Sequence, residues 1–265
     1  RRYAEAEPLM LKATEIRKAQ LGEEHPKHAT SLNNLALLYK TMGRYAEAEK
    51  LYMQAMGINK AKLGKGHPFY ASSLNNLAGL YESMGRYNEA EPLHMQALDI
   101  RKTKLGEDHP SYAASLNNLA LLYQRMGKYA KAEPMYTQAM EIWKAQLGKN
   151  HPNYAASLSG LASLYTSMGR YDEAEPMYLQ DLEIMKKALG EEHPNYATSL
   201  NNLALQYHHM GRHAEAEPLY TKAIEIRKTQ LGEEHPDYAQ SLNNLALLYV
   251  RMGRYGEAEP LYTLA

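Results

Sequence analysis

Between Pro26 and Leu63, apolar residues recur twice at the spacing of one face of an α-helix. The first set follows the i, i+3, i+4, i+7 pattern and consists of Leu32, Leu35, Ala36 and Tyr39. The second set is spaced in the same way and consists of Ala48, Leu51, Tyr52, Ala55 and Ile58. A helix brings such residues to one side because it has 3.6 residues per turn, whereas a strand would alternate. The pattern therefore predicts two amphipathic helices, over about 26–42 and 45–63, and no strand.

Proline and glycine mark the ends of these two helices. Pro26 suits the first helical position, where a missing N–H costs no hydrogen bond, and it holds His25 in extended geometry. Gly43 and Gly64 suit the left-handed residue that ends a helix. Prolines such as Pro92 fall about five residues into the second helix, so this helix either starts late or opens with a slight bend.

The same pattern returns every 42 residues without an insertion. Its clearest marker is the His-Pro pair, which occurs at His25-Pro26, His67-Pro68, His109-Pro110, His151-Pro152, His193-Pro194 and His235-Pro236. A fixed period of about 20–50 residues is typical of solenoids, in which stacked repeats share a continuous core. We predict one repeat solenoid over 1–265, with a partial repeat at 1–22, full repeats at about 23–64, 65–106, 107–148, 149–190 and 191–232, and a truncated repeat at 233–265.

The repeated motif carries a resemblance to a known family. In the type copy it runs Leu32-Asn33-Asn34-Leu35-Ala36-Leu37-Leu38-Tyr39, then Gly43-Arg44-Tyr45, Glu47-Ala48-Glu49 and Ala55. This motif resembles the tetratricopeptide repeat. The 42-residue length and the Leu-Gly-x-x-His-Pro linker resemble the kinesin light chain subtype, and the resemblance covers the whole chain. It implies an all-α fold, a right-handed α-solenoid of antiparallel helix pairs, with a concave groove for peptide segments lined by the first helix of each pair.

Asparagine pairs stand in the middle of most of these first helices, although Asn has a poor helix propensity. On the helical wheel the second residue of each pair lies away from the buried side, and it matches family residues that bond the backbone of a bound peptide. These second residues form a ladder of Asn34, Asn76, Asn118, Asn202 and Asn244. An Asn amide has a donor and an acceptor, so it pairs with any peptide unit. The alternative is that the asparagines, above all the first residues such as Asn33, bond the neighbouring helix and set the pitch of the superhelix.

The other groove positions differ between repeats and are expected to set specificity. They comprise the apolar Leu37, Leu121, Leu205 and Leu247 and the basic Lys40, Arg125, His209 and Arg251. The basic residues outnumber Glu82, which mildly favours an acidic segment, and kinesin light chain relatives are likewise associated with acidic peptides that carry a bulky aromatic residue. The fourth repeat has only small side chains here. We expect Ala156, Gly160 and Ser163 to form a recess for one bulky ligand group, which Gly160→Leu would fill.

Composition narrows the classes of function. The 30 basic and 30 acidic residues give a net charge of zero, which lacks the positive footprint of a nucleic-acid binder. The chain has no cysteine, so disulfides, thiolate metal sites and a cysteine nucleophile are excluded. No run of about 18 apolar residues is present, which predicts no membrane span. The chain begins at Arg1 without a methionine, so we expect a fragment of a longer protein.

No group of residues has the spacing of a catalytic or metal site. A Gly-rich phosphate loop, an H-E-x-x-H pattern and a G-x-S-x-G pattern are all absent. The His-Pro histidines suit a capping role, the 22 tyrosines suit packing between helices, and recurrent glutamates such as Glu47 suit the helix dipole. Trp143 stands where other repeats have mostly polar residues, such as Arg101, which predicts a half-buried place on the flank of the second helix. We expect no catalytic residue, metal or cofactor.

Together these features predict a cytoplasmic, non-enzymatic scaffold or adaptor whose partner is a protein or peptide, without nucleic acid or membrane. A second class stays open, namely a structural or ligand-sensing repeat arm of a larger multidomain signalling regulator. A third class, RNA recognition by groove residues, is disfavoured by the neutral charge. Both ends of the chain lack a polar capping helix, so we also expect end-to-end self-association of the fragment.

Overall fold

The computed structural model describes residues 2–265, and this part of the chain forms thirteen α-helices and no strand. The helices are α1 (Arg2–Leu21), α2 (Pro26–Thr41), α3 (Tyr45–Leu63), α4 (Pro68–Ser83), α5 (Tyr87–Leu105), α6 (Pro110–Arg125), α7 (Tyr129–Leu147), α8 (Pro152–Ser167), α9 (Tyr171–Leu189), α10 (Pro194–His209), α11 (His213–Leu231), α12 (Pro236–Arg251) and α13 (Tyr255–Leu264). The prediction of an all-α fold is therefore confirmed.

Each even-numbered helix begins with the His-Pro pair. His25 has extended geometry, with φ −81° and ψ 137°, and its Nδ1 accepts a hydrogen bond from the backbone N–H of Lys27 at 3.1 Å. The other five His-Pro histidines accept the same bond at 3.0–3.1 Å. A helix leaves its first N–H groups without partners, and the imidazole satisfies one of them. The predicted capping role of these histidines is confirmed.

Glycine ends the same helices as the sequence predicts. Gly43 has φ 74°, and the N–H of the next residue, Arg44, bonds back to the carbonyl of Tyr39 at 2.8 Å. This closure satisfies a carbonyl that the helix leaves open, and only glycine enters the left-handed region without strain. At the proline-containing helices the alternative of a late start is wrong, because α5 begins at Tyr87 with Pro92 inside it.

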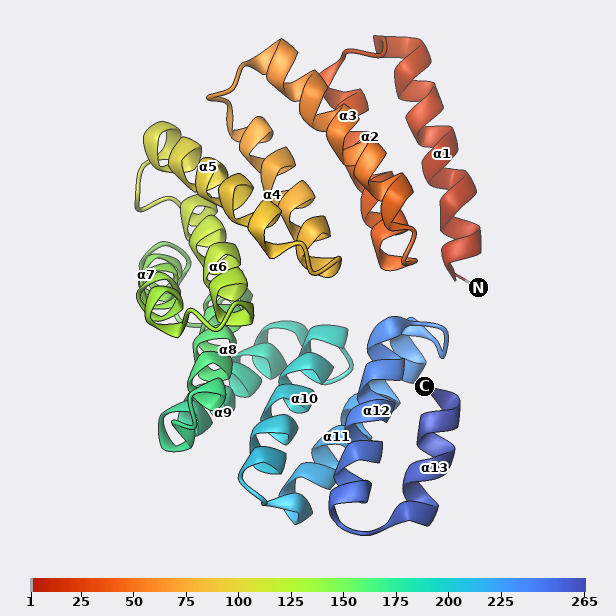
Figure 1. Cartoon of the computed structure of the whole chain (residues 1–265), viewed down its shortest axis with the longest axis vertical. Helices are drawn as coiled ribbons and strands as arrows, with labels where there is room; N and C mark the ends of the chain where they lie inside the picture. The colour runs from red at the N-terminus through yellow and green to blue at the C-terminus, as the bar shows by residue number, and fades with distance from the viewer. Residues whose placement is uncertain (1) are drawn as a thin grey trace. The chain divides into compact units, whose positions relative to one another are not determined.

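The chain divides into two compact units, which we describe separately as unit 1 (Arg1–Met135) and unit 2 (Tyr136–Ala265). In unit 1, α2 packs between α1 and α3, α4 packs between α3 and α5, and α6 packs against α5. The even helices α2, α4 and α6 also contact one another in sequence, and Figure 1 shows them in order from orange to yellow-green. The even helices of unit 1 therefore form one face.

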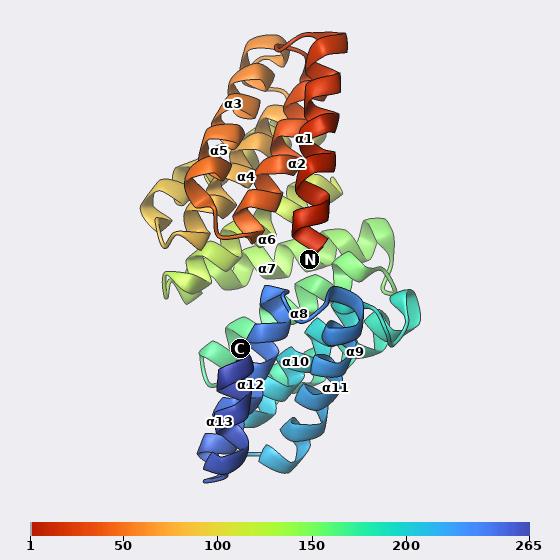
Figure 2. The same cartoon turned by 90° about the vertical axis from the view of Figure 1, so that its right-hand side faces the viewer.

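Unit 2 has the same internal order. Helix α10 packs against α9 and α11, and α12 packs against α11 and α13. The even helices α8, α10 and α12 contact one another in turn, as the green-to-blue ribbons of Figures 1 and 2 show. Each unit thus has one layer of even helices and one of odd helices, with the apolar core between the layers.

Small residues allow the helices of each pair to lie close together. Alanines such as Ala36, Ala48 and Ala55 are fully buried, and leucines such as Leu32 fill the remaining space. The large ring of Tyr39 is 8% exposed, and its equivalents in the next four repeats are equally buried. Burying an aromatic ring removes a large apolar area from water, so the repeated tyrosines stabilise the stack as predicted.

A repeated clamp ties each repeat to the one before it. The guanidinium of Arg86 donates to Glu49 of the preceding repeat at 3.2 Å and to Glu89 of its own helix at 2.7 Å. It also lies 4.1 Å from the centre of the Tyr81 ring, whose hydroxyl donates to Glu49 at 2.9 Å. Equivalent arginines are Arg44, Arg212 and Arg254. The recurrent glutamates therefore have specific partners besides the helix dipole.

The expectation for Trp143 is wrong, because it is buried, with 5% of its surface exposed, and so is Met185 of the same slot, at 6%. This slot faces the interior even where it holds a polar residue. The guanidinium of Arg101 donates to Ser115 at 2.9 Å and to Ser72 at 3.0 Å, and thereby bridges α6 and α4. A polar residue in this slot indicates a buried hydrogen-bond network, not a surface position.

Candidate functional site

The ladder asparagines lie on the side of the even helices that faces away from the core. In each unit we call this surface the ladder face; unit 1 has its own, on the exposed sides of α2, α4 and α6, and unit 2 has its own, on the exposed sides of α8, α10 and α12. In unit 1, Asn34 and Asn76 are exposed and Asn118 is half-buried. Leu37 is 53% exposed beside them, and Leu121 is half-buried. Unit 1 therefore exposes two ladder amides, Asn34 and Asn76, and one leucine, Leu37, on this face.

In two repeats the first asparagine of the pair is buried between helices. Asn75 is 8% exposed; its Nδ2 donates to Ser115 Oγ at 3.1 Å, and its Oδ1 lies 2.8 Å from Nδ1 of His94. Asn201 is 6% exposed. Since a buried amide must find partners, these residues hold neighbouring helices together. Asn243 is exposed instead, so this structural role holds for Asn75 and Asn201 and not for the first asparagine of every pair.

In unit 2 the ladder asparagines also bond neighbouring helices. Asn202 Nδ2 donates to Ser159 Oγ of α8 at 3.1 Å, and Asn244 Nδ2 donates to Asn201 Oδ1 of α10 at 3.1 Å. Both are half-buried, as is Leu205, while Leu247 is 42% exposed. Each of these amides bonds the preceding even helix through its nitrogen.

A buried carboxylate organises the ladder face of unit 1. Glu82 is 8% exposed; one oxygen lies 2.8 Å from Nε2 of His94, and the other accepts from Arg125 at 3.2 Å. His94 is 1% exposed and stands where the neighbouring repeats have Tyr52 and Tyr136. Glu82 was expected among the groove charges, whereas the role of His94 was not predicted. The sequence feature that marks His94 is the replacement of tyrosine by histidine in a repeated slot.

Lys40 extends across α4 toward this carboxylate. Its ammonium lies 3.4 Å from the position that a Cβ of Gly79 would occupy, so the absence of a side chain there leaves room for it. Burial lowers the pKa of Lys40, the charge of Glu82 opposes this, and that of Arg125 adds to it. Lys40 and Arg125 therefore place two positive charges on the ladder face of unit 1, close to the single negative charge of Glu82. Arg125 forms the ion pair with Glu82.

The recess expected in the fourth repeat is closed at its centre. Ala156 is exposed, and Gly160 and Ser163 are half-buried. A Cβ added to Gly160 would lie 2.7 Å from Cε1 of Tyr136, whose ring is 1% exposed. The space that the missing side chain leaves is filled by this ring, so the expectation that Gly160→Leu fits without disturbance is wrong.

Unit 2 has a histidine cluster at the end of α10. The ring of His208 lies 5.9 Å from that of His209 and 5.7 Å from that of His213. Burial lowers the pKa of His208, and the neighbouring charges of His209, His213 and Arg251 lower it further. His209 and Arg251 are exposed on this side. Among the described residues, no three His, Asp or Glu side chains are placed to hold a metal ion.

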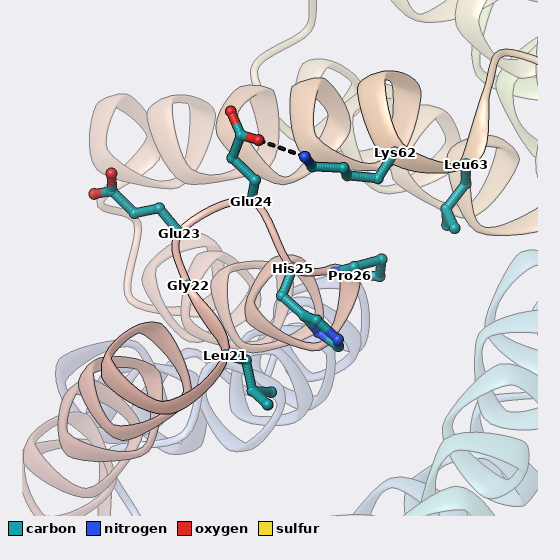
Figure 3. Close-up of a pocket in the computed structure, with 8 residues that line it drawn as sticks. All are labelled: Leu21, Gly22, Glu23, Glu24, His25, Pro26, Lys62 and Leu63. Carbon is teal, nitrogen blue, oxygen red and sulfur yellow. Dashed lines mark ion pairs between the residues drawn. The ribbon is translucent and has the colours of Figure 1, made fainter.

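A pocket of about 530 Å³ lies outside the ladder face, at the linker between α1 and α2 (Figure 3). Its charged residues already pair with one another or with a neighbour: Glu24 faces Lys62 at 2.5 Å, and Glu23 pairs with Lys18. His25 uses its Nδ1 for the helix cap. The charged side chains and the Nδ1 of His25 in this pocket therefore already serve the fold.

None of the described helices holds an apolar stretch long enough to cross a bilayer.

The family model described as tetratricopeptide repeat matches along the chain, at residues 1–61, 38–103, 69–145, 111–187, 157–229 and 197–265. The chain belongs to the tetratricopeptide repeat family. A search of the curated proteins finds none that matches.

Solved structures agree with this membership. A putative kinesin light chain from Podosopora anserina, with nearly identical TPR-like repeats, is 33% identical with a TM-score of 0.60, and the match covers 78% of this chain and 98% of that one. BtubC (BKLC) from P. vanneervenii is 26% identical with a TM-score of 0.66, covering 88% and 92%. The apo form of RapI is 17% identical with a TM-score of 0.72, covering 96% and 88%, and shares the fold. The kinesin light chain-like subtype and the all-α solenoid are thus confirmed.

Proposed function

We propose that this protein is a non-enzymatic scaffold or adaptor that binds peptide segments of its partners along the ladder face. Its family supports a protein–protein interaction scaffold in general. The observation that carries the finer proposal is the exposure of Asn34 and Asn76 in mid-helix, with no partner for either amide among the described residues. An exposed Asn inside a helix costs helix propensity relative to Ala. Binding a ligand accounts for that cost.

The chemistry of the ladder suits an extended peptide. Each amide offers a donor and an acceptor, as does each peptide unit of a ligand backbone. Leu37 and Leu121 add apolar area next to the amides of unit 1, and apolar contact contributes affinity that does not depend on hydrogen-bond geometry. In unit 2, Asn202 and Asn244 keep their Oδ1 atoms for a ligand N–H, because their Nδ2 atoms are used by the fold.

Charge supports an acidic ligand segment on unit 1. Lys40 and Arg125 approach the same carboxylate of Glu82, so one positive charge remains after pairing. Complementary charge raises the association rate and selects the partner more than it adds affinity.

Self-association of the chain stays a prediction, supported by Leu9 and Ile16 of α1, which are 68% and 45% exposed.

The ladder can be tested with the double variant Asn34→Ala/Asn76→Ala. We expect its free energy of unfolding to stay within about 0.5 kcal/mol of the parent, because both residues are exposed. Affinity for peptides selected from an acidic, aromatic-containing library falls, since each lost hydrogen bond is worth about 0.5–1.5 kcal/mol. Thermal melting and a fluorescence binding titration on the same samples provide both measurements.

Two control variants make the result specific. Asn88→Ala removes an exposed Asn from α5, away from the ladder face, and leaves both stability and affinity unchanged. Asn75→Ala removes a buried amide that bonds Ser115 and lowers stability. If the double variant melts normally yet binds every selected peptide as tightly as the parent, the ladder is not the recognition surface.

A further inference from the structure

Asp181 of α9 is a buried carboxyl group in a place where the repeat otherwise has a methyl group. The same slot holds alanine in every other copy, at Ala13, Ala55, Ala97, Ala139 and Ala223. Asp181 is 1% exposed, and neither of its oxygens has a hydrogen-bond partner among the described residues. Placing an unpaired charge in such a position is strongly unfavourable.

Helices α8 and α10 enclose this carboxyl group with polar but uncharged side chains. The hydroxyls of Ser159 on α8 and Ser199 on α10 lie close enough to lower its pKa, although neither completes a hydrogen bond to it. Helix α8 contains no Lys, Arg, His, Asp or Glu at all. On α10 the basic residues are His208 and His209, nine or more residues after Ser199, which is about 13 Å along the helix.

The position next to Asp181 on α9 also lacks the cation that other repeats supply. Arg101 and Arg227 each donate to the serine of the next even helix. Met185 takes their slot in this repeat, and so Ser199 has no guanidinium beside it. The titratable group that interacts with the charge on Asp181 is Tyr178, also on α9, and burial raises the pKa of this phenol to about 12.

Protonation of Asp181 is therefore governed by burial. Burial raises the pKa of Asp181 to about 7, although the hydroxyls of Ser199 and Ser159 oppose the shift. A protonated carboxyl group is neutral and donates one hydrogen bond to a nearby hydroxyl. An ionised one has two acceptor oxygens and a full charge, with hydroxyl groups alone to solvate it.

Ser159 links this group to the ladder face. Its Oγ accepts a hydrogen bond from Asn202 Nδ2 at 3.1 Å, so its own proton is available for Asp181. A change at Asp181 therefore acts on the serine that anchors a half-buried ladder residue of unit 2.

We propose that Asp181 is a proton-controlled latch: when protonated it allows α9 to pack tightly against α8 and α10, and when ionised it loosens this packing and the Asn202 anchor. The effect on packing is independent of any ligand. The consequence for peptide binding on unit 2 rests on the proposed function.

The direction of the pH dependence follows from linkage. The ordinary pKa of an Asp carboxyl group is about 3.9, and the folded-state pKa of Asp181 is about 7. Between these values the folded protein keeps a proton that the unfolded chain has released, so stability falls as pH rises across this window. Above about pH 7 Asp181 is ionised in both the folded and the unfolded chain, so stability no longer falls further through this group.

The sole tryptophan gives a local readout of unit 2. Trp143 belongs to unit 2 and is 5% exposed, so its fluorescence reports unfolding of this unit. We would measure urea unfolding at pH 5, 6, 7 and 8 for the parent, Asp181→Asn and Asp181→Ala. From pH 5 to pH 8 the unfolding constant of the parent rises up to about 100-fold more than that of either variant. Asp172→Asn, which removes an exposed carboxylate of the same helix, keeps the parental profile.

If Asp181→Asn retains the parental pH dependence, the latch is refuted. A second measurement applies if the variants fold poorly: the infrared band of a protonated carboxyl group in the parent should disappear as pH rises through about 7. If the infrared spectrum shows that Asp181 is fully ionised at pH 5, the latch is refuted as well.

Peptide binding tests the link to the ladder face. Peptides selected on the parent should bind unit 2 less tightly at pH 8 than at pH 6, and Asp181→Asn should remove this difference. If the unfolding profiles behave as expected but no peptide binds at all, the proposed function fails while the latch stands.

Discussion

Gly160 and Gly57 are both glycines inside helices, yet their surroundings differ. A Cβ at Gly160 meets the buried Tyr136 ring at 2.7 Å, whereas a Cβ at Gly57 meets nothing within 4 Å. Overpacking a core costs about 1–3 kcal/mol, and Ala gains up to about 1 kcal/mol over Gly in a helix. We expect Gly160→Ala to destabilise unit 2 and Gly57→Ala to stabilise unit 1 by about 0.5–1 kcal/mol.

The stability of Gly160→Ala is measured by chemical unfolding followed by Trp143 fluorescence. That of Gly57→Ala is measured by chemical unfolding followed by circular dichroism. If Gly160→Ala is as stable as the parent, the Tyr136 ring turns aside and the space beside Gly160 can open after all. That outcome would restore the recess that the sequence predicts.

Helix caps operate at the scale of single elements. His109 starts α6, and its Nδ1 accepts from the N–H of Ser111 at 3.0 Å. Removing an N-cap acceptor costs about 0.5–2 kcal/mol, while Asn caps at least as well as other residues. We expect His109→Ala to lower the melting temperature and His109→Asn to restore it. Equal melting temperatures for the parent and the Ala variant would show that the imidazole caps add nothing to stability.

At the scale of the whole molecule, the number of repeats determines stability. In a solenoid each repeat contacts its neighbours, so stability is close to a sum of repeat and interface contributions. Deleting residues 69–110 joins Pro68 to Ser111 and keeps the 42-residue period. We expect a helical protein with a lower denaturation midpoint, measured by circular dichroism in urea.

A deletion of half a repeat is the matched control. Removing 69–89 breaks the alternation of first and second helices, so unit 1 should lose cooperative unfolding. If the 42-residue deletion behaves like this half-repeat deletion, the repeats are not independent structural modules.

Helix ends and the order of elements could be read from the sequence because they depend on neighbours along the chain. Pro26 and Gly43 set the limits of α2 through their own backbone geometry. The 42-residue period then predicted that every later helix pair repeats the first. The exposed side of α2 and α4, with Asn34 and Asn76, followed from helical periodicity for the same reason.

Contacts between repeats were decided by the tertiary structure. Glu82 meets Arg125, 43 residues away, and Gly160 meets Tyr136 on another helix, so neither pairing follows from local pattern. Arg101 looked like a surface residue because the sequence shows its charge but not the serines that receive it. The burial of Asp181 is likewise a property of the α8 and α10 side chains around it, since helical spacing places a residue on a face but does not say what covers that face.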